Sequence, residues 1–254
     1  KARHDLWKMW LRSYHEPAEK DLQRAANAYL RGAAKRYADR AEEYVTPSKT
    51  KGVIDFASLL DTNTERALIA QVIGSKWRKW YFVSGGNALK EIMRLAGLPV
   101  DEMPLSEDLA NDYIDTLAKQ LVITQENAVK RIIEDGLMDG LPVPTIAKNI
   151  QAATGFGFAR ARLIARTEAT KASALGSQQA FSQAAADGIN VRKQWLSARD
   201  DKVRDSHADL DGFTVGVNEE FISITGATAA GPAQFGEPAE DINCRCVVIP
   251  VVGD

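Results

Sequence analysis

Hydrophobic residues recur at every third or fourth position through most of the first 187 residues, which is the spacing of one face of an α-helix. The longest stripe runs from Leu22 to Tyr44, and Pro17 is expected to separate it from a shorter helix over about residues 4–15. A loop is expected at residues 84–86, where a serine precedes two glycines. Further helices are predicted over about residues 62–81, 89–95, 106–121, 125–137 and 145–153.

The pattern changes near residue 188. An alanine-rich helix is predicted from about 159 to 186, with Gly188 at its C-terminal end. Short β-like runs follow at 191–196, 213–217 and 246–252, and the intervening residues 223–240 are rich in Gly, Ala, Thr and Pro, as in a long loop. The predicted fold is therefore mostly α: a helical region over 1–120, suited to partner docking, and an α+β module over 121–254 with a long helix on a short antiparallel sheet.

Composition excludes several classes of protein. The chain has 254 residues, of which 45% are hydrophobic and 26% charged, so it can bury a core without a disulfide framework, for which two cysteines would not suffice. No apolar run is long enough for a membrane span. The first residue is Lys1, so we expect the natural start to lie elsewhere, and the lack of an export signal predicts synthesis in a reducing cytoplasm.

The net charge of −2 conceals an uneven distribution. Residues 1–50 carry 11 Lys and Arg against 7 Asp and Glu, whereas residues 199–254 carry 4 against 11. The basic N-terminal segment allows a DNA-contacting alternative, although ordinary solvated helix faces are the simpler explanation. That alternative would use Arg3, Lys8, Arg12, Arg24, Arg31 and Arg36.

Three groups of residues could carry chemistry. The first is Arg166, Thr167 and Glu168 in the long helix, for which a structural ion pair is the simpler interpretation, since Arg rarely transfers protons. The second is the acidic segment around His207, and the third is the pair Cys244 and Cys246. Cysteines at i and i+2 share a face of an extended strand.

One histidine and two cysteines are three of the four ligands that a tetrahedral zinc ion takes. The thiols could equally be small buried hydrophobic groups, and His207 could simply bond backbone carbonyls. A catalytic version of the metal site would be a hydrolase or nuclease that also uses Asp201 and Asp205. The sequence has no nucleophile or phosphate-binding motif, so we expect a protein that is not an enzyme.

Two pairs of tryptophans, Trp7 with Trp10 and Trp77 with Trp80, lie at i and i+3 beside basic residues. Indoles flanked by cations are favoured in protein interfaces, although packing in the core is the commoner explanation.

The order of these groups resembles the phage Mu F-like head morphogenesis family, the minor head proteins of tailed phages, over about residues 120–250. The residues that carry the resemblance are Arg166, Thr167, Glu168, Trp195, Asp201, Arg204, His207, Gly212, Cys244, Arg245 and Cys246. The resemblance implies a virion protein present in few copies, located in the phage head near the portal and active in head assembly. It implies the portal protein, the major capsid protein and packaged DNA as partners, and in some phages ejection with the DNA.

Overall fold

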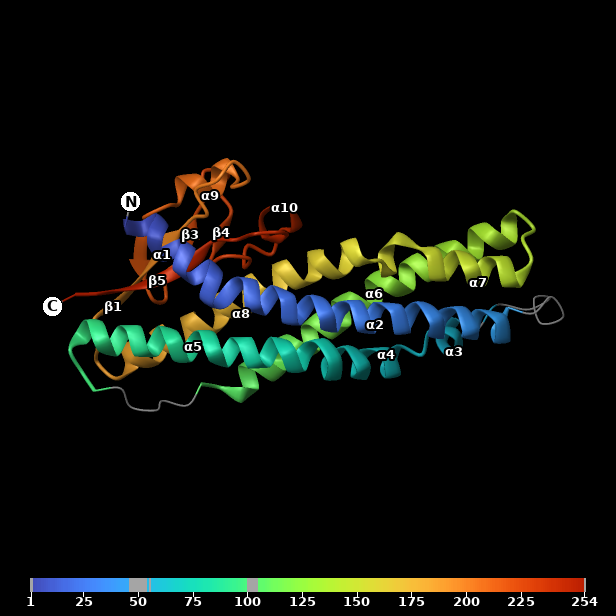
Figure 1. The fold of residues 1–254 in the computed structure, drawn as a ribbon, viewed down its shortest axis with the longest axis horizontal. Helices are drawn as coiled ribbons and strands as arrows, with labels where there is room; N and C mark the ends of the chain where they lie inside the picture. Colours follow the sequence, from blue (N-terminus) through green and yellow to red (C-terminus); the bar gives the residue numbers. More distant parts are fainter. Residues whose placement is uncertain (1, 46–53, 55, 100–104, 254) are drawn as a thin grey trace. The chain divides into compact units, whose positions relative to one another are not determined.

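A computed structural model describes residues 2–45, 54, 56–99 and 105–253 (Figure 1). The chain forms two compact units, and each combines segments that are distant in sequence. The first unit contains Lys1–Leu22, Lys76–Ala110 and Ala165–Asp254, and the second contains Gln23–Ser75 and Asn111–Ile164. These units do not coincide with a division near residue 120.

The chain begins with α1 (Ala2–Trp10), a π-helical turn η1 (Leu11–His15) and α2 (Glu16–Tyr44). The break that we expected at Pro17 is absent. Pro17 lies in the first turn of α2, directly after the wider π-turn, in which the Glu16 N–H donates to the carbonyl of Leu11, five residues back. Because proline lacks an N–H and crowds the preceding turn, a wider turn allows the chain to stay helical here.

The remaining helices differ from prediction at two places. Residues 84–86 lie inside α5, so the expected loop is wrong, and the helices predicted over 106–121 and 125–137 are one continuous helix, α6. The bounds are α3 Phe56–Leu60, α4 Thr62–Ile69, the π-turn η2 Ala70–Gly74, α5 Ser75–Ala96, α6 Glu107–Met138, α7 Val143–Ala152, the 3-10 turn η3 Thr154–Phe156 and α8 Phe158–Ala186.

Close packing between α5 and α8 explains Gly85 of α5 and Gly176 of α8. A Cβ on Gly176 of α8 would lie 2.3 Å from the backbone oxygen of Tyr81 and 3.0 Å from the nitrogen of Gly85. The neighbouring Ser84 hydroxyl donates to the Ser173 carbonyl at 3.1 Å. The glycines therefore mark a helix–helix contact without room for side chains, where the sequence alone suggested a turn.

The second unit is helical throughout its described residues and contains a fully buried carboxylate. Glu65 of α4 accepts hydrogen bonds from Arg36 at 2.7 and 2.8 Å and from Arg40 at 3.2 Å. The Tyr29 hydroxyl also donates to it at 3.1 Å. Two guanidinium groups thus compensate the burial of one carboxylate.

The first unit carries the small sheet, whose strand order is β2-β1-β5 with both pairings antiparallel. The strands are β1 Val191–Leu196, β2 Thr214–Gly216 and β5 Val247–Val252, and β3 Phe221–Ile222 pairs separately with β4 Thr228–Ala229. Two short helices, α9 Asp205–Asp209 and α10 Pro238–Asp241, lie in the connections. The predicted fold class is confirmed: mostly helical, with a small antiparallel sheet near the C-terminus.

The sheet follows α8 through a tight turn. Gly188 has φ +87°, and its N–H donates to the carbonyl of Ala185, which ends α8 where the sequence predicted. Val191 and Trp195 then direct their side chains into a core that α5 and α8 complete with Leu89, Ile92 and Phe181. This core positions the residues of the candidate site.

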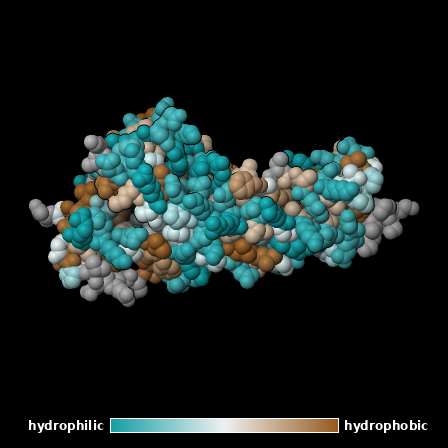
Figure 2. Space-filling view, viewed as in Figure 1, coloured by the Kyte–Doolittle hydropathy of each residue, from teal (hydrophilic) through white to brown (hydrophobic). Residues whose placement is uncertain are grey.

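The face drawn in Figure 2 is largely hydrophilic, and its hydrophobic residues lie in separate groups. Among the described residues, no helix is long and apolar enough to span a membrane.

Candidate functional site

The long helix α8 connects the motif residues to the N-terminal helices. Arg166 donates two hydrogen bonds to the carboxylate of Glu19 in α2, at 3.1 and 3.4 Å. One turn further, the Thr170 hydroxyl donates to the carbonyl of Cys244 at 2.6 Å and is fully buried. Thr167 accepts the N–H of Asn243, a residue with φ +62°. Residues of α8 therefore hold the backbone directly before and directly after Cys244.

Thr170 also contacts a buried histidine that the sequence did not single out. The His15 Nε2 lies 3.2 Å from the Thr170 hydroxyl oxygen. Because Thr170 uses its own proton for the Cys244 carbonyl, the Nε2 of His15 must be the donor in this contact. Burial is the main cause that lowers the pKa of His15 to about 3, and the positive charges of Arg166 and Arg245 contribute to the same shift. His15 is therefore neutral in the folded protein at neutral pH.

Charged residues hold the loops that carry the motif. Arg245 donates to both carboxylate oxygens of Asp200, at 2.6 and 2.7 Å, and Arg204 donates to the carbonyl of Ile242 at 2.6 Å. The carbonyl of Arg245 accepts the indole N–H of Trp7 at 2.9 Å. These contacts fix the Asn243–Cys246 segment against both α1 and the loop before α9, as the structural interpretation of the charged motif residues predicts.

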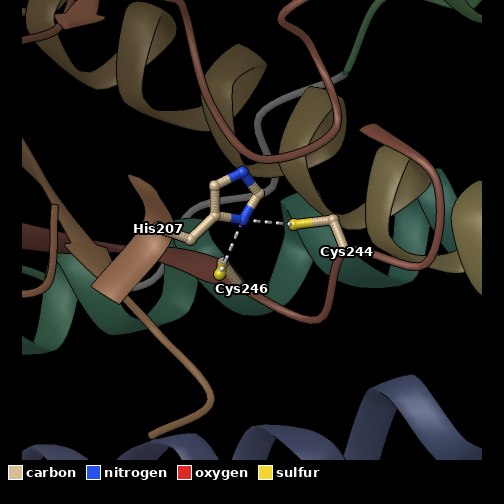
Figure 3. Close-up of side chains that lie close together, drawn as sticks. All are labelled: His207, Cys244 and Cys246. Carbon is tan, nitrogen blue, oxygen red and sulfur yellow. Dashed lines mark hydrogen bonds between the residues drawn. The ribbon is translucent and has the colours of Figure 1, made fainter. Parts of the chain in front are cut away.

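His207, Cys244 and Cys246 converge in the first unit (Figure 3). The Nδ1 of His207 lies 3.6 Å from the Sγ of Cys244 and 3.6 Å from the Sγ of Cys246. Their ligand atoms all lie within 4.8 Å of one another, and all three side chains are buried. Figure 3 shows Nδ1 directed between the two sulfur atoms. The structure thus brings together the three side chains that the sequence offered as possible metal ligands.

The other ring nitrogen of His207 faces an acid that the sequence did not single out. The Oε2 of Glu240 in α10 lies 3.1 Å from the Nε2, off the ideal direction of the N–H bond. The same oxygen accepts the hydroxyl proton of Ser206 at 2.9 Å. A carboxylate beside Nε2 favours the tautomer with a proton there, which leaves a lone pair on Nδ1.

The two thiols differ electrostatically. The hydrogen bond from Cys246 is the main cause that lowers the pKa of Cys244, and His207 lowers it further, whereas burial raises the pKa of Cys246. The cysteines are not bonded to each other.

Aromatic rings enclose the histidine. Phe235 stacks on the His207 ring at a centroid distance of 5.5 Å, and Trp195 meets it edge-on at 5.5 Å. Trp195 is itself fully buried. Such an enclosed arrangement suits a structural metal ion or a hydrogen-bonded core, because a substrate would have to displace these rings.

Other motif residues are not part of this cluster. Asp201 and Asp205 are exposed, and neither belongs to the group of neighbouring ligand atoms, so the described residues do not assemble the acid-assisted hydrolase site that we considered. Glu168 is buried in α8. Gly212, with φ +91°, donates its N–H to the Trp195 carbonyl at 2.8 Å, so it serves a turn.

The tryptophans mostly pack inside the chain. Trp7, Trp77 and Trp80 are at most 8% exposed, and the partly buried Trp10 donates its indole N–H to Ser173 at 3.1 Å. Packing in the core, the commoner of the two explanations, accounts for these positions.

The six basic residues proposed for DNA contact differ in their surroundings. Arg3 pairs with Asp211 at 3.8 Å and Arg36 pairs with Glu65, whereas Lys8, Arg12, Arg24 and Arg31 are exposed. Two of the six cations therefore already contact carboxylates of the chain itself.

Comparisons with known proteins match part of the chain. A family model described as "Phage Mu protein F like protein" matches residues 127–249. The chain is 33% identical over 126 residues to the minor head protein GP7 of Bacillus phage SPP1, which is 50% of this chain and 41% of GP7. It is 40% identical over 161 residues to an NAD(+)–arginine ADP-ribosyltransferase, EFV, of Enterococcus faecalis (strain ATCC 700802 / V583), which is 63% of this chain and 31% of that protein.

A third relative, the uncharacterized protein YqbB of Bacillus subtilis (strain 168), is 28% identical over 145 residues, 56% of this chain and 47% of YqbB. The chain thus spans less than half the length of these three relatives. No solved structure matches it significantly.

Proposed function

We propose, on the premise that residues 127–249 are a domain of the Phage Mu protein F like family, that this protein is a minor structural component of a phage head. The family match confirms the resemblance expected from the sequence. We further propose a position near the portal, with the portal protein or the major capsid protein as partners.

The observation that best supports a structural role is the pairing of the motif residues with other groups of the same chain. Arg166, Arg204 and Arg245 each donate to another part of the same chain. Arg166 connects α8 to α2, whereas Arg204 and Arg245 connect the loop before α9 to the segment before β5. Groups that are occupied in this way hold a module together and are not free for substrate. The similarity to a minor head protein supports the phage head as the place where this module works.

The relative named as an ADP-ribosyltransferase raises an enzymatic alternative. Its aligned part is 31% of its length, which leaves most of that protein without a counterpart here. We infer that the chain acts without catalysis. Incubation of the purified protein with labelled NAD⁺ and an arginine-containing acceptor should give no labelled acceptor, and transfer above background would contradict this inference.

The head role can be tested in the phage or prophage that carries the gene. Deletion of the gene should reduce the yield of infectious particles, and the wild-type gene supplied in trans should restore it. The protein should also be detected in purified particles by mass spectrometry. Particles with full infectivity that lack the protein would refute the proposal.

Two variants separate a structural role of the motif from a direct contact. Arg245→Ala removes the pairing with Asp200 and should lower both the melting temperature and the particle yield, whereas the exposed Lys202→Ala nearby should change neither. An Arg245→Ala protein that melts like wild type but fails in assembly would contradict the structural role. Cross-linking of assembled heads would then show whether the portal protein lies beside this chain.

A further inference from the structure

We propose that the His207 Nδ1 and the sulfurs of Cys244 and Cys246 bind one Zn²⁺ ion that holds the C-terminal module together. These three side chains come from α9 and from the segment that leads into β5, and they meet in the core of the first unit. A shared ion would join α9 to the segment before β5, because Cys244 and Cys246 lie 37 and 39 positions after His207 in the sequence.

The distances from the histidine nitrogen to the two sulfurs agree with this ion. Zinc lies about 2.3 Å from a thiolate sulfur and about 2.0–2.1 Å from an imidazole nitrogen, so tetrahedral angles place the sulfur and the nitrogen about 3.6 Å apart. Both nitrogen–sulfur distances in the site are 3.6 Å. Zinc could therefore lie between Nδ1 and the two sulfurs, which are at most 4.8 Å apart, whereas tetrahedral coordination places two thiolates about 3.8 Å apart. Binding would require the two cysteine side chains to approach each other by at most about 1 Å.

The protonation pattern also fits. Glu240 lies beside the Nε2 of His207, and a carboxylate at that nitrogen is the usual partner of a zinc-bound histidine, since it orients the ring and keeps a lone pair on the other nitrogen. That other nitrogen is the one directed at both sulfurs (Figure 3). Glu240 is thus a positioning residue for the ligand and not a ligand itself.

Charge balance favours zinc in a buried site. On binding, Zn²⁺ replaces the thiol protons, which leave to solvent, and two thiolates together neutralise its two positive charges. The ion and its two thiolates then carry no net charge, which lowers the cost of burying them. Soft sulfur and imidazole donors select zinc over Mg²⁺ or Ca²⁺.

The site supplies three protein ligands. Among the described residues, no further His, Cys, Asp or Glu joins the group, so the fourth position would be taken by water. Phe235 and Trp195 cover the histidine, which favours a structural ion over a catalytic one.

The first experiment measures metal in the full chain purified under reducing conditions without chelator from zinc-supplemented cells. We expect about one zinc per chain, and exchange of Zn²⁺ for Co²⁺ should give the intense thiolate-to-cobalt absorption that carboxylate or water ligands do not produce. Substoichiometric zinc together with no such absorption would overturn the proposal. A disulfide between Cys244 and Cys246 in the freshly purified protein would overturn it too.

Variants then locate the ion. Cys244→Ser combined with Cys246→Ser should abolish zinc binding, and retention of zinc by this variant would refute the assignment. If the variant does not fold, the cobalt spectrum of the wild-type chain remains decisive, because these are the only two cysteines of the sequence.

A matched pair of variants tests the role of Glu240. Glu240→Gln should weaken zinc affinity by about 10- to 100-fold in a competition with a chromogenic chelator. The exposed Glu237→Gln in the same loop should leave the affinity unchanged. Equal zinc affinities of the two variants would show that Glu240 does not orient His207 for zinc binding.

Discussion

At the residue scale, the motif depends on partners that are distant in the sequence. Thr170 and His15 are 155 positions apart, and Thr170 and Cys244 are 74 positions apart, yet one hydroxyl connects all three. The hydroxyl accepts from the imidazole and donates to the carbonyl, so both of its hydrogen-bonding roles are used. Burial and the charges of Arg166 and Arg245 make a second proton on the His15 ring costly.

The buried His15 predicts a pH dependence of stability. Its pKa is about 3 when folded and about 6.5 when unfolded, so between these values the unfolded chain binds a proton that the folded chain does not. This contribution is fully present above pH 6.5 and is lost as the pH falls. From pH 7.5 to 5.5 it should lower the free energy of unfolding by about 1.4 kcal/mol.

Urea unfolding at these two pH values would measure the effect. The His15→Gln variant should lose about 1.4 kcal/mol less than wild type over the same interval, whatever its stability at pH 7.5. Equal losses in both proteins would show that His15 is protonated in the folded state.

The sequence could identify some of these residues and not others. His207, Cys244 and Cys246 stand out because few residue types bind metals and the chain has few of them. Thr170 and Glu240 belong to common residue types, and His15 is distant from the motif in the sequence. The roles of all three arise only when α8, η1 and α10 are placed against the motif. Pairing of this kind depends on tertiary packing, which local patterns do not encode.

At the scale of elements, the contact between α5 and α8 depends on backbone proximity. Gly176 and Gly85 face each other, and Ser84 bonds to α8 beside them. Propensity alone favours a break at two successive glycines, but the packing of two helices stabilises α5 through them. Tertiary contacts therefore outweigh the local cost.

Two Gly→Ala substitutions should change the free energy of unfolding in opposite directions. Gly176→Ala places a Cβ against the backbone of α5 and should destabilise the chain by about 1–3 kcal/mol, because neither backbone can move without separating the helices. Gly86→Ala meets no atom within 4 Å and should stabilise it by about 0.5–1 kcal/mol. Chemical denaturation of both variants would check this, and a neutral Gly176→Ala would contradict the close approach.

At the scale of the whole molecule, the two compact units are each assembled from both halves of the sequence. Hydrophobic periodicity correctly predicted the helical class, the long α8 and the sheet strands. It gave no information on which helices share a core, because an apolar stripe shows that a face is buried but not against what. The motif module shares its core with α5, whose residues match no part of the family model.

A fragment of residues 121–254 should therefore not fold by itself. It would lack Leu89 and Ile92 of α5 and Trp7 of α1, all of which are buried against the sheet or α8 in the full chain. We expect the fragment to melt without a cooperative transition in circular dichroism, whereas the full chain should melt cooperatively. A sharp transition and a dispersed NMR spectrum from the fragment would show that the module is autonomous.

The bond from Trp7 to the carbonyl of Arg245 joins residues 238 positions apart, and it has a consequence for biosynthesis. Contacts of such high contact order form slowly and only after the intervening chain exists. During synthesis, the face of α1 that carries Trp7 therefore stays exposed to solvent until almost all of the chain has left the ribosome. Production of this protein should accordingly depend on chaperones that bind the nascent N-terminal segment.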